Sequence, residues 1–388
     1  MSTPIKTTKK LEIAVIVPWE RKCGIATYSD YLMESLAKGD CYTATYPLPT
    51  AHFKIAYVNL AQRINRHFYD IVHIQHAPAL FGGDRKGVFT LARFLEELSA
   101  KCVVTLHEVG RGKRLYKKVR NLGDIFINFK DFNFNSWYGP YLNYLFVKSL
   151  NKVKAVVVHS DSQKNILIKA GVHDDKVRVI AHGIPKVPEH NYNQAQLKQQ
   201  YSLQGKFLLS TFGFVKRFKD YPTVIRALND LPKNVVYIIA GGAQTQDDGL
   251  YLNEIRLLVK KMGLESRVLF TGFLSGEMLQ QYHVMADLMV FPYKTSTASG
   301  AMAHAFAYGK AILASELPIT QEINSAEPDT IKIYSDQEKL CSNILEICSS
   351  AKIQAKLEDS SLSYAKKYSF SEMARKTEDL YKEVFNHD

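Results

Sequence analysis

The strongest constraint on the fold of this 388-residue chain comes from short apolar segments that recur along it. In the first half these segments are LEIAVIV (11–17), DIVHIQ (70–75), CVVTLH (102–107), KAVVVHS (154–160) and VRVIAHG (177–183). They are continuously apolar rather than alternating, which is typical of strands that are buried on both faces of a parallel sheet. Because amphipathic stretches separate them, the pattern predicts repeated strand–helix–strand units.

The same rhythm starts again after a polar stretch that contains prolines. Its apolar segments are FLLSTFG, VVYIIAGG, RVLFTGF, DLMVFPY and KAILAS. Two sets of strands predict two doubly wound α/β domains, as does a length well above the usual size of about 100–200 residues for one domain. We expect an N-terminal domain over residues 1–183, a linker over 184–206 and a C-terminal domain over 207–369. The helical segment 370–388 is compatible with either domain, including a return to the N-terminal one.

Composition excludes several classes of protein. No stretch of about 18 or more apolar residues is present, so no membrane span is expected. The start of the chain has no small-residue cleavage site after its apolar run, so no export signal is predicted. The five cysteines are odd in number and form no C-x-x-C pair, which indicates neither a disulfide framework nor a zinc site. These features predict a cytoplasmic protein.

Positive charge is concentrated in one segment. The net charge is +12, and residues 101–154 hold eleven Lys/Arg against three Asp/Glu. Residues 111–154 combine cations with aromatic side chains, which suits an anionic membrane surface or a lipid-linked diphosphate. The alternative is a solvated basic helix followed by an aromatic core segment. A peripheral position on the inner membrane face is therefore one prediction, whereas nucleic acid is not expected because no recognition motif accompanies the charge.

The loops after the strands are the candidate sites, since doubly wound domains bind ligands at the carboxyl ends of their strands. In the first half, Gly24 lies between a strand and a helix, where backbone amides can approach a phosphate. His107 follows another strand in a long loop flanked by glycines, and an imidazole there can bond sugar hydroxyls or stabilise charge. His76 and His182 occupy similar positions but are weaker candidates. Each histidine also has a structural alternative as a capped core residue.

In the second half, STFGFVKRFKDY places Gly213 at a strand end, with Lys216, Arg217 and Lys219 close behind it. Three cations beside the carboxyl end of a strand suit a diphosphate. A solvated lysine loop is the structural alternative.

The stretch STASGAMAHAFAYGKAILAS predicts a helix that begins after Ser299 and ends at Gly309. Its first amides, beginning at Gly300, would be free to bind an anion at the positive end of the helix dipole. His304 follows one turn later on the same face. A core helix with a satisfied histidine would explain the alanines but not the Ser-Gly entry.

Together these loops resemble glycosyltransferase family 4. The resemblance rests on CGIATYSDYL, YDIVHIQHAPALFGG with VVTLHEV, VRVIAHGIP, FGFVKRFKDY, VLFTGFLSGEMLQQYHVMADLMVFPY and ASGAMAHAFAYGKAILASELP, and it runs through nearly the whole chain. Such enzymes are retaining transferases with two Rossmann-like domains that face a central cleft, the GT-B fold. The resemblance implies a cytoplasmic enzyme of polysaccharide biosynthesis that moves a sugar from a nucleotide-diphosphate sugar to a glycan, lipid-linked or small-molecule acceptor.

The resemblance also implies roles for particular residues. The donor diphosphate would be held by Lys216 and Lys219 and by the helix start at Ser299 and Gly300. His107 would lie near the donor sugar and support the transition state. The nucleobase would lie near the loop TGF (271–273), which contains Gly272. Neither a metal nor a cofactor other than the donor substrate is expected.

This sequence departs from the common family pattern at its best-known point. Family members usually carry two glutamates around this helix start, and Ser296 and His304 occupy those positions here. We interpret the chain as a member of a branch that lacks the pair, with the ribose contact passing to His304. Phe214 also replaces a common arginine, whose role we assign to Lys216. The lost glutamates leave open a non-catalytic sugar-nucleotide-binding subunit, and an epimerase acting on the sugar nucleotide is a further alternative.

Overall fold

The computed structural model describes residues 10–19, 23–49, 54–109, 134–274, 276–295 and 299–387. The chain divides into two compact units. Unit 1 comprises residues 1–183 and 370–388, and unit 2 comprises residues 184–369.

Unit 1 is built on a parallel sheet of six strands with the order β2-β1-β3-β4-β5-β6. The strands are β1 (Leu11–Val17), β2 (Cys41–Pro47), β3 (Ile71–His76), β4 (Lys101–Leu106), β5 (Ala155–Val158) and β6 (Val177–Val179). Between them lie α1 (Gly24–Leu36), α2 (Lys54–Asn65), a 3-10 turn (Pro78–Phe81), α3 (Gly83–Glu97), α5 (Phe134–Lys152), α6 (Asp161–Ala170) and a second 3-10 turn (Asp174–Lys176). Helices cover both faces of the sheet, which explains the continuous apolar strands that the sequence shows.

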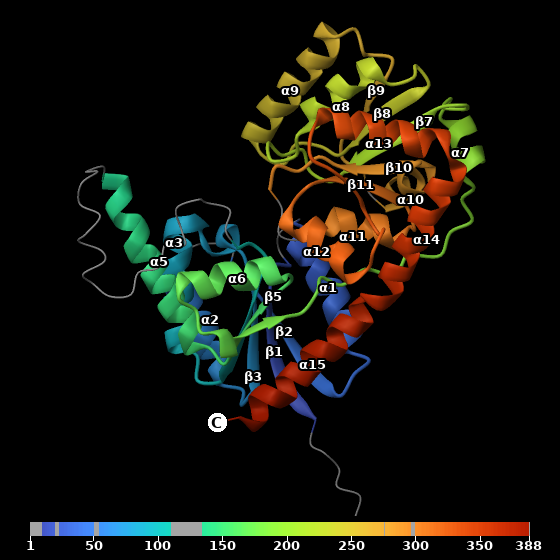
Figure 1. The fold of residues 1–388 in the computed structure, drawn as a ribbon. Coiled ribbons are helices and arrows are strands. Elements are labelled where there is room, and N and C mark those ends of the chain that lie inside the picture. Colours follow the sequence, from blue (N-terminus) through green and yellow to red (C-terminus); the bar gives the residue numbers. More distant parts are fainter. Residues whose placement is uncertain are drawn as a thin grey trace, which may run out of the picture. The chain divides into compact units, whose positions relative to one another are not determined.

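The last helix, α15 (Phe370–Asn386), belongs to unit 1 and lies along α1 (Figure 1). Its Met373, Leu380 and Tyr381 side chains are buried in the same cluster as the β1 residues Ile13 and Val15. The buried residues of α15 recur with the period of a helix, at positions 370, 373–374, 377, 380–381 and 384, so one face of the helix closes the sheet of unit 1.

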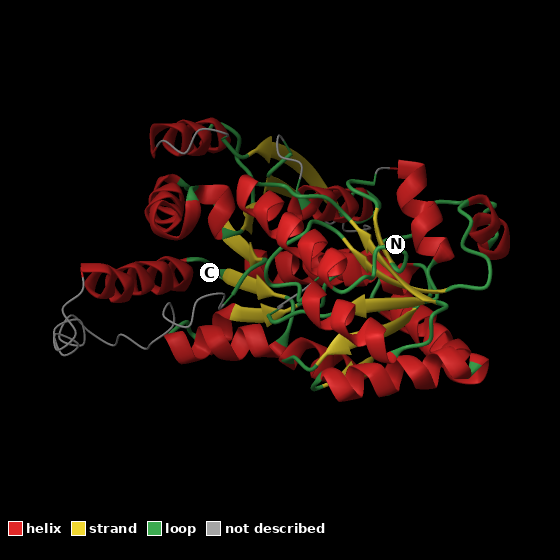
Figure 2. Ribbon diagram, turned by 90° about the horizontal axis from the view of Figure 1, so that it is seen from above, coloured by secondary structure: helices red, strands yellow, loops and turns green. Residues whose placement is uncertain are grey.

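Unit 2 contains a second parallel sheet of six strands, with the order β12-β11-β10-β7-β8-β9. The strands are β7 (Phe207–Phe212), β8 (Val235–Ala240), β9 (Val268–Phe270), β10 (Leu288–Phe291), β11 (Ala311–Ser315) and β12 (Lys332–Tyr334). The helices are α7 (Gln194–Gln200), α8 (Tyr221–Ala227) with a 3-10 turn (Leu228–Asp230), α9 (Gln246–Lys261), α10 (Gly276–Met285), α11 (Gly300–Ala307), α12 (Pro318–Ala326), α13 (Gln337–Ser349) and α14 (Ala351–Lys367). Figure 2 shows the strands with helices on either side.

The two sheets confirm the predicted fold class of two Rossmann-like, doubly wound α/β domains. Two strands were not anticipated. The β2 strand has a mixed, partly exposed pattern because it lies at a sheet edge, and β12 is an edge strand of only three residues. Both therefore lack the long apolar run that marks a central strand. None of the helices in the described part of the chain combines the length and apolar character that a bilayer span requires.

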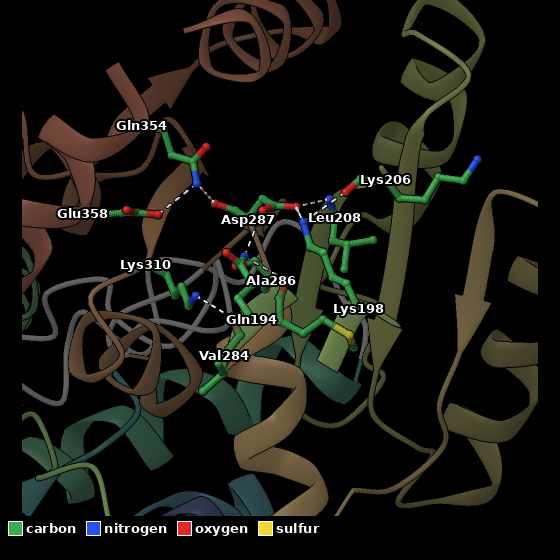
Figure 3. Close-up of polar contacts among 11 residues, drawn as sticks. Gln194, Lys198, Lys206, Leu208, Val284, Ala286, Asp287, Lys310, Gln354 and Glu358 are labelled. Atoms are coloured by element: carbon green, nitrogen blue, oxygen red, sulfur yellow. Dashed lines mark hydrogen bonds and ion pairs between the residues drawn. The ribbon is translucent and has the colours of Figure 1, made fainter. Parts of the chain in front are cut away.

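The stretch 184–206, expected from sequence to be a linker, lies in unit 2 and includes α7. Figure 3 shows how Asp287, just before β10, ties this stretch to the sheet. Its carboxylate accepts hydrogen bonds from Lys198 Nζ at 2.6 Å and Gln194 Nε2 at 2.9 Å, both on α7, and from the Leu208 amide at 2.7 Å. Because Asp287 and Lys198 are largely buried, removing one partner would cost roughly 3–5 kcal/mol.

Candidate functional site

Strand order indicates where each unit would bind a ligand. In unit 2 the chain runs from β7 outward through β8 and β9, and then crosses to β10 on the other side of β7. Loops leaving β7 and β10 therefore diverge in opposite directions, and open α/β sheets bind ligands in the crevice that forms at such a point. The loop after β7 begins at Gly213, and the loop after β10 leads to the start of α11.

Lys219 joins these two loops. It forms an isolated bridge to Tyr293, its Nζ lies 5.7 Å from the centre of the Tyr293 ring, and the same atom donates a 2.7 Å hydrogen bond to the Phe212 carbonyl. The side chain is 5% exposed, and among the described residues no carboxylate pairs with it. Burial, and secondly the charge of Lys216, lowers the pKa of Lys219 to about 7. A buried ammonium without a counter-ion is stabilised by an anion that arrives from solution.

Gly213 is adjacent to this ammonium. It has a positive φ of +91°, which favours glycine, and a Cβ built there would lie 3.1 Å from Lys219 Nζ and 3.8 Å from Ala301 Cβ. The loop after β7, the lysine and the first turn of α11 are therefore neighbours in unit 2.

The start of α11 matches its prediction. Ser299 is the N-cap, and its hydroxyl accepts a hydrogen bond from the Met302 amide at 3.2 Å. Gly300 is open, since a Cβ built on it would meet nothing within 4 Å. The early amides of a helix have no partner within it, so this end of α11 offers N–H donors and a partial positive charge. At the other end, Gly309 adopts a φ of +59° just beyond the helix.

Lys216 and His304 have different surroundings. Lys216 Nζ is ion-paired with Asp248 Oδ2 at 2.6 Å, and Asp248 also caps the start of α9. The role of Lys216 at a diphosphate stays a prediction. His304 is half-buried one turn into α11, its ring centre lies 5.9 Å from that of His283, and burial lowers its pKa. Its predicted ribose contact likewise stays a prediction, and Ser296 lies outside the described residues.

Gly272, in the loop after β9, has a φ of +70° and open space beside it. The next residue, Phe273, is 68% exposed and stacks with Phe214, with ring centres 6.3 Å apart. Gly242 brings the loop after β8 against this one, since a Cβ built there would lie 3.2 Å from the Phe273 amide nitrogen. The loops after β7, β8 and β9 thus form one edge with the exposed ring of Phe273 and the half-buried ring of Phe214, which is a surface on which a planar base can stack.

In unit 1, Gly24 begins α1 and has open space beside it, while the preceding residues 20–22 lie outside the described residues. The N-cap residue Cys23 makes no side-chain capping bond. Gly24 belongs to a different unit from Gly213, Lys219 and Gly300, and its role in donor binding stays a prediction.

His107 follows β4 and lies in a cluster of rings. Its ring centre is 4.5 Å from that of Tyr28 and 5.4 Å from that of His159, and His159 is 5.4 Å from His182. The pKa of His107 is well below the ordinary value of 6.5 because of burial and then because of the neighbouring histidines. The imidazole is therefore neutral near pH 7 and acts as a hydrogen-bonding group rather than as a cation.

Sequence reasoning missed the buried side chains of β3 that form hydrogen bonds toward His107. Gln75 Oε1 lies 2.9 Å from His107 Nε2, and His73 lies behind Gln75. A signal was present, because VHIQHAP places two polar residues on one face of a fully buried strand, and buried polar groups need partners. Of the weaker candidates, His76 is buried beside Phe81, and His182 Nδ1 lies 2.7 Å from the Gly183 carbonyl oxygen.

Two further predictions concern metal and membrane. Within the described ranges, no group of three or more His, Cys, Asp or Glu side chains is placed to hold a metal ion.

Most of the basic segment 111–154 lies outside the described residues, which resume at residue 134. Contact of this segment with an anionic membrane stays a prediction.

Comparisons with known proteins show which families and structures this chain resembles. Residues 35–186 match the family model described as Glycosyltransferase Family 4, and residues 193–361 match the model described as Glycosyl transferases group 1. A curated relative, mannosylfructose-phosphate synthase of Agrobacterium fabrum, is 27% identical over 108 residues. That alignment spans 26% of this chain and 24% of the relative.

Solved structures are similar over almost the full chain. One is HepE of Anabaena, solved in complex with UDP and glucose, with a TM-score of 0.71, 15% identity, and coverage of 96% of this chain and 100% of that one. Another is sucrose-phosphate synthase of Thermosynechococcus elongatus, with a TM-score of 0.72, 17% identity, and coverage of 97% and 99%. At these identities the likeness concerns the fold.

Proposed function

Because this chain belongs to glycosyltransferase family 4, in a form with two Rossmann-like domains, we propose that it is a retaining transferase that uses a nucleotide-diphosphate sugar as donor. The acceptor would be a hydroxyl of a glycan, a lipid-linked sugar or a small molecule. A segment that contacts an anionic membrane, residues 111–154, is part of the same proposal, since it would bring a lipid-linked acceptor close to the enzyme.

The observation that carries the proposal is the group formed by Gly213, Lys219 and the start of α11. One buried ammonium without a carboxylate partner among the described residues lies beside open helix amides, at the strand-order switch of unit 2. That arrangement suits a diphosphate, whose charge would be met by the lysine and by the helix dipole. The complexes of HepE with UDP and with UDP-glucose support a donor of this class.

The proposed reaction follows from the charge balance. The bond between the anomeric carbon of the donor sugar and the diphosphate oxygen breaks, and the diphosphate leaves with the electron pair. Lys219 and the α11 amides stabilise the negative charge that develops, without any requirement for a metal. The acceptor oxygen bonds to the anomeric carbon on the side that the diphosphate leaves, and its proton passes to a phosphate oxygen. The configuration at the anomeric carbon is thereby retained.

His107 would act on the sugar. A neutral imidazole can accept a hydrogen bond from a sugar hydroxyl and can stabilise positive charge that develops on the ring in the transition state. Unit 1 would in this way supply an uncharged hydrogen-bonding group, and unit 2 would supply the positive charge.

A panel of UDP-, GDP-, ADP- and TDP-sugars tests the proposal. We expect one donor class to raise the melting temperature of the protein, because a ligand that binds only the folded state stabilises it. The same donor should slowly release free nucleoside diphosphate when incubated with the protein. An isomerised donor would indicate an epimerase instead, and binding without turnover, even with added glycan or lipid-linked acceptors, would indicate a non-catalytic subunit.

A further inference from the structure

A line of buried polar side chains runs behind His107 in unit 1. Gln75 and His73 alternate along β3, Thr105 lies on the neighbouring strand β4, and Tyr381 comes from α15. All four are at most 1% exposed. Polar groups buried this deeply cost free energy unless they bond to one another, so the pattern of their bonds is well defined.

The contacts form a continuous path. His107 Nε2 lies 2.9 Å from Gln75 Oε1, and Gln75 Nε2 lies 3.4 Å from His73 Nε2. The same His73 nitrogen is 2.7 Å from Thr105 Oγ1, and His73 Nδ1 is 2.6 Å from the Tyr381 hydroxyl. The path thus extends from the carboxyl end of β4 to the last helix of the chain.

The chemistry of the Gln75 amide determines which atom donates and which accepts at each of these contacts. An amide oxygen only accepts, so His107 Nε2 must carry the proton that it donates to Gln75. The amide nitrogen donates, so His73 Nε2 accepts, and His73 Nδ1 carries a proton that it donates to Tyr381. Every shared hydrogen then has one donor and one acceptor.

We propose that Gln75, supported by His73 and Tyr381, is a positioning residue that holds His107 in the tautomer with its proton on Nε2. His107 Nδ1 then keeps its lone pair, and it has no hydrogen-bond partner among the described residues. This nitrogen is an acceptor, so it selects a ligand group that donates, such as a sugar hydroxyl. The assignment of that hydroxyl rests on the proposed function, whereas the tautomer itself does not.

The protonation state makes the tautomer important. Burial holds the pKa of His107 well below 6.5 and lowers that of His73 to about 3, so both rings are neutral near pH 7. A neutral imidazole has one donor and one acceptor nitrogen, and the bond made by one nitrogen sets the role of the other. His159, His182 and His76 also lower this pKa, and among the described residues none of their imidazoles is a hydrogen-bond partner of His107 Nε2.

Nitrogen NMR of the full chain with isotope-labelled histidine, in the absence of donor and acceptor, tests the proposal. A His107→Asn variant identifies the His107 signals. In the wild type we expect the proton on Nε2 near neutral pH. Gln75→Leu should give a mixture of the two tautomers, and Gln75→Glu should keep Nε2 protonated while raising the pKa of His107, because a carboxylate favours the imidazolium.

Thr105→Val is the matched control. It removes one of the three partners of His73 from an equally buried position and leaves the bond between Gln75 and His107, so the tautomer should stay as in the wild type. A proton on Nδ1 in the wild type would overturn the proposal, as would an unchanged tautomer in Gln75→Leu. If Gln75→Leu does not fold, a His107 pKa unmoved in Gln75→Glu overturns it equally. Because no substrate is present, these outcomes are independent of whether the protein transfers a sugar.

Discussion

The carboxyl edges of the two sheets differ in chemistry although both sheets are parallel and six-stranded. The edge of unit 1 gathers aromatic and imidazole rings, with His107, His159 and His182 around Tyr28. The edge of unit 2 gathers a buried ammonium, glycines and the start of a helix. Similar scaffolds therefore present two kinds of group: neutral hydrogen-bonding groups suited to hydroxyls in unit 1, and positive charge suited to phosphates in unit 2.

Substitution of Lys219 should have the largest effect on this contrast. We expect Lys219→Ala to slow nucleoside diphosphate release by about 10²–10³-fold, as loss of one group that stabilises a developing negative charge does. The fold should stay intact, because removing a buried ammonium without a carboxylate partner among the described residues offsets the loss of its hydrogen bond to the Phe212 carbonyl. Lys260→Ala, at an exposed position on α9, is the control. A near wild-type rate in Lys219→Ala would contradict the placement of the diphosphate.

Substitution of His107 tests the role of the neutral hydrogen-bonding groups in unit 1. His107→Ala should slow turnover by about 10- to 100-fold, the cost of one hydrogen bond to a group that gains charge in the transition state. Affinity for the nucleoside diphosphate that binds best in the panel should change by less than about twofold, because this ligand lacks the sugar that His107 is proposed to contact. His67→Ala, an exposed histidine of unit 1, is the control. A large loss of nucleotide affinity in His107→Ala would show that the division between the units is wrong.

The pH dependence of nucleotide binding should follow Lys219. Below its pKa of about 7 the ammonium is already charged, so binding of an anion takes up no proton there. Above pH 7 the free protein loses this proton, while the bound anion favours the charged form and restores it. Affinity should therefore fall as the pH rises through 7, by up to about tenfold per pH unit. Calorimetry in buffers of different ionisation enthalpy would count the protons, and an affinity that is flat from pH 7 to above 8 would refute the assignment.

Substitution of the first glycine of α11 or of α1 should have the smallest effect on nucleotide binding. At both Gly300 in unit 2 and Gly24 in unit 1, an added Cβ would meet nothing within 4 Å, so replacement by alanine should leave the melting temperature unchanged. Gly300→Ala should weaken nucleotide binding about threefold, because the methyl group hinders the approach of a phosphate to the first amides. Gly24→Ala should leave binding as in the wild type if the diphosphate binds only to unit 2. Weakened binding in Gly24→Ala would instead support the sequence-based role of Gly24.

Much of the candidate site was accessible from sequence because its signals are local. The N-cap at Ser299 and the turn at Gly309 were predicted from short-range rules and are present in the structure. Lys219 was predicted, together with Lys216, to meet the charge of the diphosphate. The structure distinguishes it from Lys216, which is paired with Asp248, a residue far along the chain. Pairing of that kind depends on how the β7 loop meets α9, and no local pattern encodes it.

The sequence by itself determined the two parallel sheets and the loops that follow their strands, because burial on both faces and helix capping leave their mark on neighbouring residues. Only the tertiary structure decided which of the polar residues are brought together. Tyr381 reaches His73 across more than three hundred residues of chain, and Gln75 reaches His107 from an adjacent strand. Contacts between residues so far apart in sequence arise from packing. Their geometry determines which ring nitrogen of His107 carries a proton, and it leaves the Lys219 ammonium without a carboxylate partner among the described residues.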